Sequence, residues 1–289
     1  MKILLTIFLS AICSSCADYV TSQTKTVSSE SVILSVPEGW VLYPSPAADS
    51  SALQCANYSR REWKVEPSES KVKIRLDKLQ DHQASLPAII NSRSVAVGTK
   101  GYRSVEQVDD GWLVGLDVGE FGGGLWWFSS DGKSSKKLSE DRIKGFAKTS
   151  TGVFAVTGLA HLSFDDGKIL QIGNGTAGNR KIQTLADLGS APQAFVVESS
   201  DSLLILTIRG LVRVKTSGIT EQLLATKYQQ LYPNSMILLS SGVIYVGMRH
   251  FVTRLTPTEN RYKEEWFVPD NCTQFKERDY DCVCLSKEK

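Results

Sequence analysis

The sequence predicts an all-β fold in which a unit of four short strands is repeated along the chain. The clearest unit contains the stretch GVFAVTGLAHLSFDDGKILQI at residues 152–172, where runs of alternating apolar residues are separated by turn-forming residues. We expect Gly158 to end one strand and Asp165-Asp166-Gly167 to form a tight hairpin turn. The strands expected in this unit are 145–148, 153–157, 161–164 and 168–172.

The same pattern occurs in three further copies, each with a strand, a small or acidic turn and a hydrophobic strand. The corresponding turn residues are Gly111, Gly152, Ser202 and Gly242, which are 41, 50 and 40 residues apart by their numbers. A period of about 40–50 residues is typical of a four-stranded propeller blade. Such a blade needs a neighbour on each face to bury its apolar side chains.

Two copies carry the repeat most clearly, at residues 109–115 (DDGWLVG) and 240–247 (SSGVIYVG). These motifs resemble the short repeats of two-component-regulator-type and NHL-like β-propellers, and the resemblance extends over residues 102–269. The whole arrangement is also similar to a group of uncharacterised exported bacterial propeller proteins. The resemblance implies a β-propeller fold but no activity. Four four-stranded blades are recognisable, and we expect five to seven in total, with one to three more from the irregular first third and the tail.

The first residues predict export through a signal peptide at residues 1–17. A basic start is followed by an apolar run at residues 3–12, which is too short to cross a bilayer, and then by small residues. Cleavage after Ala17 would release a soluble chain, whereas cleavage before Cys16 would place a lipid on that cysteine. Both outcomes stay open. We therefore expect the chain in the periplasm, anchored as a lipoprotein, or secreted.

Composition divides the remaining chain into four segments. A mobile leader rich in Ser and Thr is expected at 18–31, followed by an irregular β-rich segment at 32–101 that belongs to the propeller and holds a single helix at 79–90. The propeller repeats occupy 102–270, and a cysteine-containing tail covers 271–289.

Four cysteines follow the signal segment, an even number that predicts disulfides in an exported chain. A bridge between Cys282 and Cys284 would close a small strained ring. We therefore expect one of these two to pair with Cys272 and the other with Cys55. The Cys-Val-Cys spacing is too tight for an ordinary zinc site, so we predict no metal and no other cofactor.

The charge pattern predicts no nucleic-acid partner. The net charge is +2, and Lys and Arg are scattered among Asp and Glu without a basic face. We expect a monomer that contacts membranes only through an N-terminal lipid. Its expected partner is a protein or a small-molecule ligand of the cell envelope.

The partner is expected on one face of the repeats. In antiparallel blades, the loops between second and third strands and the links between blades fall on the same face. Residues 173–179 are placed there as one of these links. The predicted rim residues are Glu120, Phe121, Gly122, Gly123, Gly124, His161, Arg209, Arg249, His250, Tyr232 and Asn234.

The glycine-rich segment 119–124 is the most distinctive part of that rim, with about six more residues than the same loop of the second copy. Three glycines allow either a close backbone approach to a ligand or an unusual turn. No phosphate-loop lysine follows them. We expect an insertion packed by Trp126 and Trp127, and partner contact is the alternative.

His161 and His250 occupy nearly matching positions in two copies. A pair of imidazoles on one rim could bind a metal or carry protons. No third ligand recurs at the same offset, so we expect each histidine to satisfy loop backbone groups.

The sequence shows no nucleophile elbow and no Ser, His and Asp order of known type, so no catalytic residue is predicted. It therefore favours an exported binding or scaffolding module of the cell envelope over an enzyme. One alternative is a hydrolase or lactonase-like propeller enzyme with a metal in its channel. The other is an inhibitor or sensor of another envelope protein or of a toxin.

Overall fold

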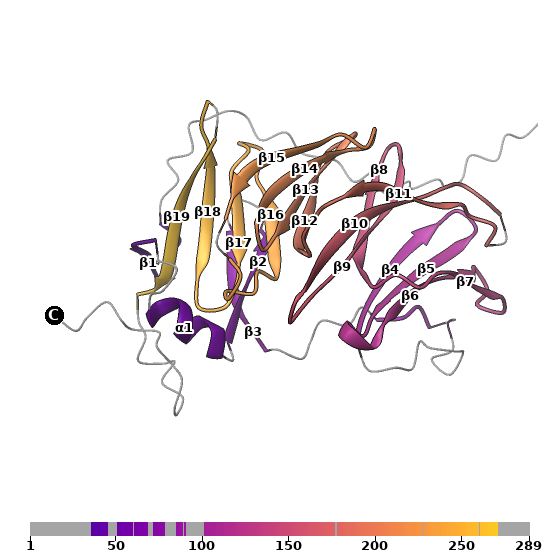
Figure 1. The fold of residues 1–289 in the computed structure, drawn as a ribbon, viewed down its shortest axis with the longest axis horizontal. Coiled ribbons are helices and arrows are strands. Elements are labelled where there is room, and N and C mark those ends of the chain that lie inside the picture. The colour runs from indigo at the N-terminus through magenta and orange to yellow at the C-terminus, as the bar shows by residue number, and fades with distance from the viewer. Residues whose placement is uncertain are drawn as a thin grey trace, which may run out of the picture. The chain divides into compact units, whose positions relative to one another are not determined.

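The computed structural model describes residues 36–45, 51–59, 61–68, 72–78, 85–88, 90, 101–176, 178–226, 228–259 and 261–270. These residues are mainly β-structure (Figure 1) and all belong to one unit, Ile33–Lys289. The predicted signal segment with Cys16, the leader, and the tail with Cys272, Cys282 and Cys284 lie outside the described residues. In the ranges that are described, no helix is long and apolar enough to cross a membrane.

The repeat region forms four antiparallel sheets, in each of which four consecutive strands are neighbours, so the predicted all-β fold with four four-stranded blades is confirmed within the described ranges. Blade 1 consists of β4 (Tyr102–Val108), β5 (Gly111–Asp117), β6 (Gly123–Ser129) and β7 (Ser135–Ser139). Blade 2 consists of β8 (Ile143–Thr149), β9 (Gly152–His161), β10 (Phe164–Ile172) and β11 (Ile182–Asp187). Blade 3 consists of β12 (Pro192–Ser199), β13 (Ser202–Thr207), β14 (Gly210–Lys215) and β15 (Thr220–Ala225). Blade 4 consists of β16 (Ser235–Leu238), β17 (Ile244–Gly247), β18 (Val252–Pro257) and β19 (Tyr262–Pro269).

Successive blades pack face to face. Adjacent side chains of a strand point to opposite faces, and on β13 both Leu203 and Leu204 are fully buried. Leu203 belongs to a core with Phe154 of blade 2, whereas Leu204 belongs to a core with Ile244 of blade 4. Blades 1 and 2 share a third core of the same kind. Since burying one leucine contributes about 2 kcal/mol, these sandwiched cores are the main source of stability, as in propeller blades.

The amino-terminal segment adds to blade 4. Strand β1 (Trp40–Tyr43) pairs antiparallel with β19 as a fifth strand. The hairpin of β2 (Arg61–Pro67) and β3 (Val72–Lys78) shares a core with blade 4, in which Trp63 packs with Tyr245. The helix predicted at 79–90 is wrong for the described residues 85–88 and 90, which are not helical. A helix lies instead at α1 (Ser51–Tyr58), which includes Cys55.

The strand boundaries predicted in blade 2 are also wrong. Strand β9 continues through Gly158, and Asp165 to Gly167 lie within β10, so the hairpin turn is Leu162-Ser163. Gly158 and Gly167 face each other in register. A Cβ atom on Gly158 would come within 2.6 Å of Pro192 Cδ, and one on Gly167 within 2.5 Å. These two glycines therefore allow β12 to pack closely rather than turning the chain.

Candidate functional site

The loops between second and third strands and the links between blades lie at the same end of the blades, at the lower edge of Figure 1, and we call this end the loop face. The loops are 118–122, 162–163, 208–209 and 248–251, and the described links are 140–142, 188–191, 226 and 228–234. The predicted placement of residues 173–179 on this face is wrong. The described residues of that segment join the third strand of blade 2 to its fourth, at the opposite end.

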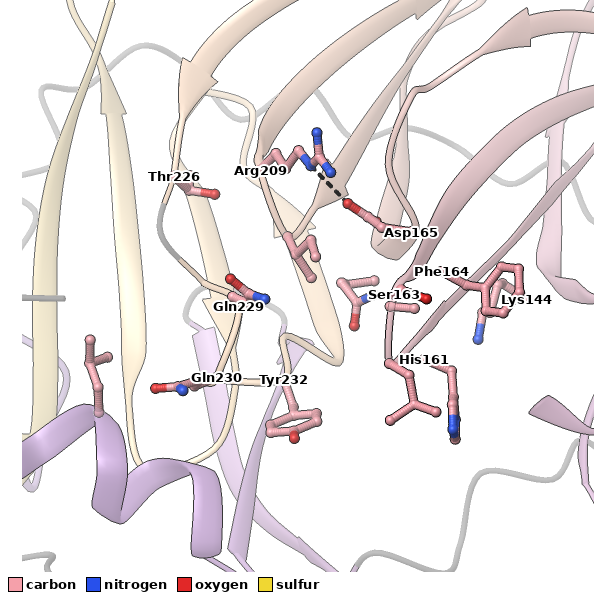
Figure 2. Close-up of a pocket in the computed structure, with 15 residues that line it drawn as sticks. Lys144, His161, Ser163, Phe164, Asp165, Arg209, Thr226, Gln229, Gln230 and Tyr232 are labelled. Carbon is pink, nitrogen blue, oxygen red and sulfur yellow. Dashed lines mark hydrogen bonds and ion pairs between the residues drawn. The ribbon is translucent and has the colours of Figure 1, made fainter. Parts of the chain in front are cut away.

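A pocket of about 700 Å³ opens on the loop face (Figure 2). Its walls come from the β9–β10 tip, the 208–209 loop, the link before β16 and α1. Three of the predicted rim residues line it, namely His161, Arg209 and Tyr232. The other lining residues are Leu53, Lys144, Ala160, Leu162, Ser163, Phe164, Asp165, Gln193, Ile208, Thr226, Gln229 and Gln230.

The glycine-rich insertion begins at a buried carboxylate. One oxygen of Asp117 accepts a hydrogen bond from the Gly119 amide (2.9 Å), and the other pairs with the Lys144 ammonium group (2.6 Å). A short 3₁₀ helix, η2 (Gly119–Phe121), follows. Because both oxygens are engaged inside the protein, Asp117 fixes the base of the insertion to blade 2.

Two of the three glycines predicted in the insertion, Gly122 and Gly123, have a structural reason to be glycine. Gly122 has φ +107°, a conformation that side chains disfavour. A Cβ atom on Gly123 would lie 2.6 Å from Arg142 Cα. Gly123 and Gly124 belong to strand β6, so the insertion is shorter than predicted. The expected packing partners Trp126 and Trp127 are both buried.

The insertion touches the tip of blade 2 through a contact between a carboxylate and an imidazole. Glu120 Oε2 lies 3.2 Å from His161 Nε2, which connects η2 to the end of β9. Three large apolar side chains on these two neighbouring loops face solvent, and we call them the apolar tips. They are Phe121, Leu162 and Phe164, with exposed fractions of 83%, 93% and 65%.

Backbone strain is concentrated on the loop face. In the described part of the chain, the non-glycine residues with positive φ are Leu162 (+54°), Tyr232 (+49°) and His250 (+67°). All three lie in loops or links of this face. A left-handed backbone costs an L-residue roughly 1–2 kcal/mol, and such strain is typical of functional sites.

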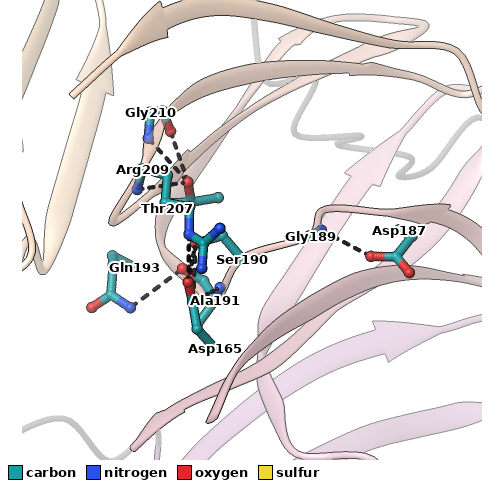
Figure 3. Close-up of polar contacts among 9 residues, drawn as sticks. All are labelled: Asp165, Asp187, Gly189, Ser190, Ala191, Gln193, Thr207, Arg209 and Gly210. Carbon is teal, nitrogen blue, oxygen red and sulfur yellow. Dashed lines mark hydrogen bonds and ion pairs between the residues drawn. The ribbon is translucent and has the colours of Figure 1, made fainter. Parts of the chain in front are cut away.

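A carboxylate that the sequence interpretation assigned to a turn organises one wall of the pocket (Figure 3). Asp165 accepts hydrogen bonds from the Ser190 hydroxyl (2.9 Å), the Ala191 amide (2.7 Å) and the Arg209 guanidinium group (2.7 Å). These partners belong to the link before blade 3 and to a loop of blade 3. Asp165 therefore joins two blades at the loop face.

Arg249 and Tyr232 form a second polar group. The Arg249 guanidinium carbon lies 3.7 Å from the centre of the Tyr232 ring, and Arg249 Nε donates to Glu62 (3.0 Å). The Tyr232 hydroxyl donates to Asn57 of α1 (3.0 Å). Asn234 donates a longer bond to Glu62 (3.4 Å). These contacts connect β2 and α1 to blade 4.

His161 and His250 both lie just before the third strand of their blades, as predicted, but in different surroundings. His161 is partly exposed and lines the pocket, whereas His250 is buried with its ring 4.6 Å from the Phe251 ring in an edge-on contact. The two imidazoles therefore do not form a pair on one rim. The described residues contain no group of three His, Cys, Asp or Glu side chains that could hold a metal.

A second cavity of about 640 Å³ is lined mainly by the first strands of the blades and by β2, and it shares Lys144, Gln193 and Tyr232 with the first pocket. Two carboxylates of this lining face basic side chains, Glu62 opposite Arg249 and Asp117 opposite Lys144. Charge is therefore balanced locally at both positions.

The sequence interpretation missed Asp165, Gln229 and Gln230 as lining residues. The two glutamines lie in the link between blades 3 and 4, which is longer than the links 140–142 and 188–191. The length of this link could have pointed to the two glutamines, because longer connections often carry functional residues.

No protein-family model matches the sequence. No curated protein matches it either. Among solved structures, it is similar to a protein of unknown function from Bacteroides thetaiotaomicron (12% identity, 56% of this chain and 43% of that one, TM-score 0.39). It is also similar to a protein of unknown function from Bacteroides caccae (12%, 72% and 73%, TM-score 0.38). A third match is the calcium-binding protein regucalcin from Agrobacterium tumefaciens (13%, 71% and 66%, TM-score 0.41).

The chain thus spans less than half of the first of these structures. The assignment of the chain as a propeller-type repeat protein rests on its own four blades and the cores between them.

Proposed function

We propose that the chain is an exported binding module of the cell envelope that holds its partner on the loop face. The observation that carries the proposal is the group of apolar tips, Phe121, Leu162 and Phe164. Large apolar side chains exposed on neighbouring loops are typical of a contact site. Here they lie beside a pocket, so one partner can contact both.

Leu162 gives this proposal its physical basis. It occupies a two-residue hairpin turn with φ +54°, where glycine would be unstrained. Its side chain is 93% exposed and so gains almost no burial on folding. A strained residue that does not stabilise the fold is readily explained by a contact with a partner.

The loops that carry the apolar tips are held firmly at their bases. The Asp117 contacts fix the insertion, and the Asp165 contacts fix the wall beside the β9–β10 tip. A surface that is already ordered loses less conformational entropy when it binds. These contacts support a binding role for the face.

The local charge balance favours binding over metal-dependent hydrolysis. Lys144 and Arg249 each pair with a carboxylate that lines the second cavity. A carboxylate with a close basic partner is a poorer ligand for a cation. The hydrolase alternative is therefore not proposed.

The proposal predicts that apolar-tip variants lose partner capture. Immobilised mature chain is incubated with envelope extract, and the bound material of the native chain is compared with that of a Phe121→Ser, Phe164→Ser double variant. Both side chains are largely exposed, so the variant should fold normally. We expect at least tenfold less captured partner.

The matched control is Ile219→Ser, because Ile219 is also exposed but lies in the turn between β14 and β15, at the opposite end. This control should capture the partner as the native chain does. Equal capture by all three proteins would overturn the role of the apolar tips. Fractionation of cells that express the chain from Met1 tests export, and a purely cytoplasmic chain would refute it.

A further inference from the structure

The pocket on the loop face has an unusual balance of polar groups. Among the described lining residues, each basic side chain has a carboxylate of the protein within contact distance, which lowers the attraction of this pocket for an anionic ligand. The pairs are Lys144 with Asp117 (2.6 Å), His161 with Glu120 (3.2 Å) and Arg209 with Asp165 (2.7 Å).

The polar groups that remain available are neutral. Gln229, Gln230 and Ser163 line the pocket, and their side chains have no hydrogen-bond partner among the described residues. The Thr226 hydroxyl is buried and has no partner in the described part of the chain. Buried polar groups are nearly always satisfied, by protein, water or ligand. This rule applies to the Thr226 hydroxyl, whereas Gln229, Gln230 and Ser163 are exposed and present two amides and a hydroxyl to the open side of the pocket.

These groups suit a ligand with neighbouring hydroxyls. A glutamine amide presents a donor and an acceptor side by side, and a hydroxyl both donates and accepts. Adjacent sugar hydroxyls present the same combination, so one amide can bind two of them. A peptide backbone has one donor and one acceptor per residue, spaced along an extended chain, and matches clustered amides less well.

Two aromatic side chains border the same space. Phe164 extends from the start of β10, and Tyr232 lies on the other side of the pocket, in the link before blade 4 (Figure 2). Both are partly exposed. The Arg249 contact and the Asn57 hydrogen bond hold the Tyr232 ring in place. A fixed aromatic ring provides an apolar surface for the C–H face of a sugar ring.

We propose that this pocket binds a neutral oligosaccharide, with the amides of Gln229 and Gln230 on its hydroxyls and Tyr232 against a ring face. The volume of about 700 Å³ lies within the range of small-ligand sites. The inference rests on the proposed function, because it names the ligand class of the same loop face.

The test is an array of neutral oligosaccharides of hexoses and N-acetylhexosamines, with sulfated and carboxylated glycans and an unstructured peptide set on the same surface. We expect binding to neutral glycans. Titration calorimetry of the best glycan then compares the native chain with a Gln229→Ala, Gln230→Ala double variant. The loss of two neutral hydrogen-bonding groups should weaken binding about tenfold or more.

The matched control is Gln171→Ala, Gln183→Ala, which removes two amides that bond each other on blade 2, outside the pocket lining. It should bind like the native chain. Binding only to acidic glycans, only to peptides or to nothing on the array would overturn the inference. It would also be overturned if the Gln229→Ala, Gln230→Ala variant bound the glycan as tightly as the control variant does. If apolar-tip-dependent capture persists without glycan binding, the inference fails and the proposed function stands. If that capture is also absent, both fail.

Discussion

The tips of blades 2 and 3 occupy equivalent positions but are built differently. At the blade 3 tip, the Thr207 hydroxyl accepts from the Arg209 and Gly210 amides and donates to the Gly210 carbonyl, so the turn satisfies its own backbone. At the blade 2 tip, Leu162 is strained and exposed. The same repeat position therefore stabilises the turn in blade 3, whereas in blade 2 it leaves a side chain exposed to a partner.

The largest expected effect comes from removing the carboxylate that joins the blade 2 tip to the link before blade 3. Asp165→Ala removes the acceptor of the Ser190 and Ala191 bonds and should lower the free energy of unfolding by about 3 kcal/mol. Urea unfolding measures the change. Arg209→Ala is the control, and because Arg209 is well exposed, its loss should cost less than about 1 kcal/mol. Equal effects would show that the ion pair, and not the backbone bond, joins the blades.

The second prediction concerns the pH dependence of stability, which we expect to depend on blade 4 and not on the apolar tips of the loop face. Burial raises the pKa of the Glu264 carboxyl, which accepts a hydrogen bond from the buried Tyr228 hydroxyl. The folded state therefore holds this proton more tightly than the unfolded state. The contribution of this group to stability is fully present below its ordinary pKa and is lost as pH rises through the raised value.

Glu264→Gln should consequently flatten the fall of stability above the ordinary carboxyl range, as measured by thermal unfolding at several pH values. Changes at Leu162 should not alter that slope, since backbone strain does not titrate. If Glu264→Gln leaves this slope unchanged, the half-buried Glu264 carboxyl is not the cause of the fall in stability.

The repeated blades could be predicted because each carries its own local pattern. Alternating apolar residues and turns at Gly111, Gly152 and Gly242 mark strands wherever they occur. Gly167 misled the prediction because its contact with Pro192 is distant in the chain and leaves no local signal. An Asp-Asp-Gly run alone therefore does not distinguish a turn from a strand.

The candidate site was predicted only in part, since loop positions do not determine exposure. His161 and His250 match in offset, yet one lines a pocket and the other packs on Phe251. The role of Asp165 depends on partners in another blade, and the pocket glutamines come from a link of irregular length. These contacts and exposures do not recur at a fixed spacing along the sequence, so the repeat pattern could not predict them.

The most direct test of the account is Leu162→Gly, measured for both stability and capture. Glycine accepts φ +54° without strain, although it is more flexible when unfolded. We expect the free energy of unfolding to stay equal or rise by up to about 1 kcal/mol, while capture of the envelope partner falls at least tenfold. Leu162→Ala, which keeps the strain, should lose capture without the gain. A destabilised Leu162→Gly chain, or one that captures its partner normally, would contradict the claim that this residue serves binding rather than folding.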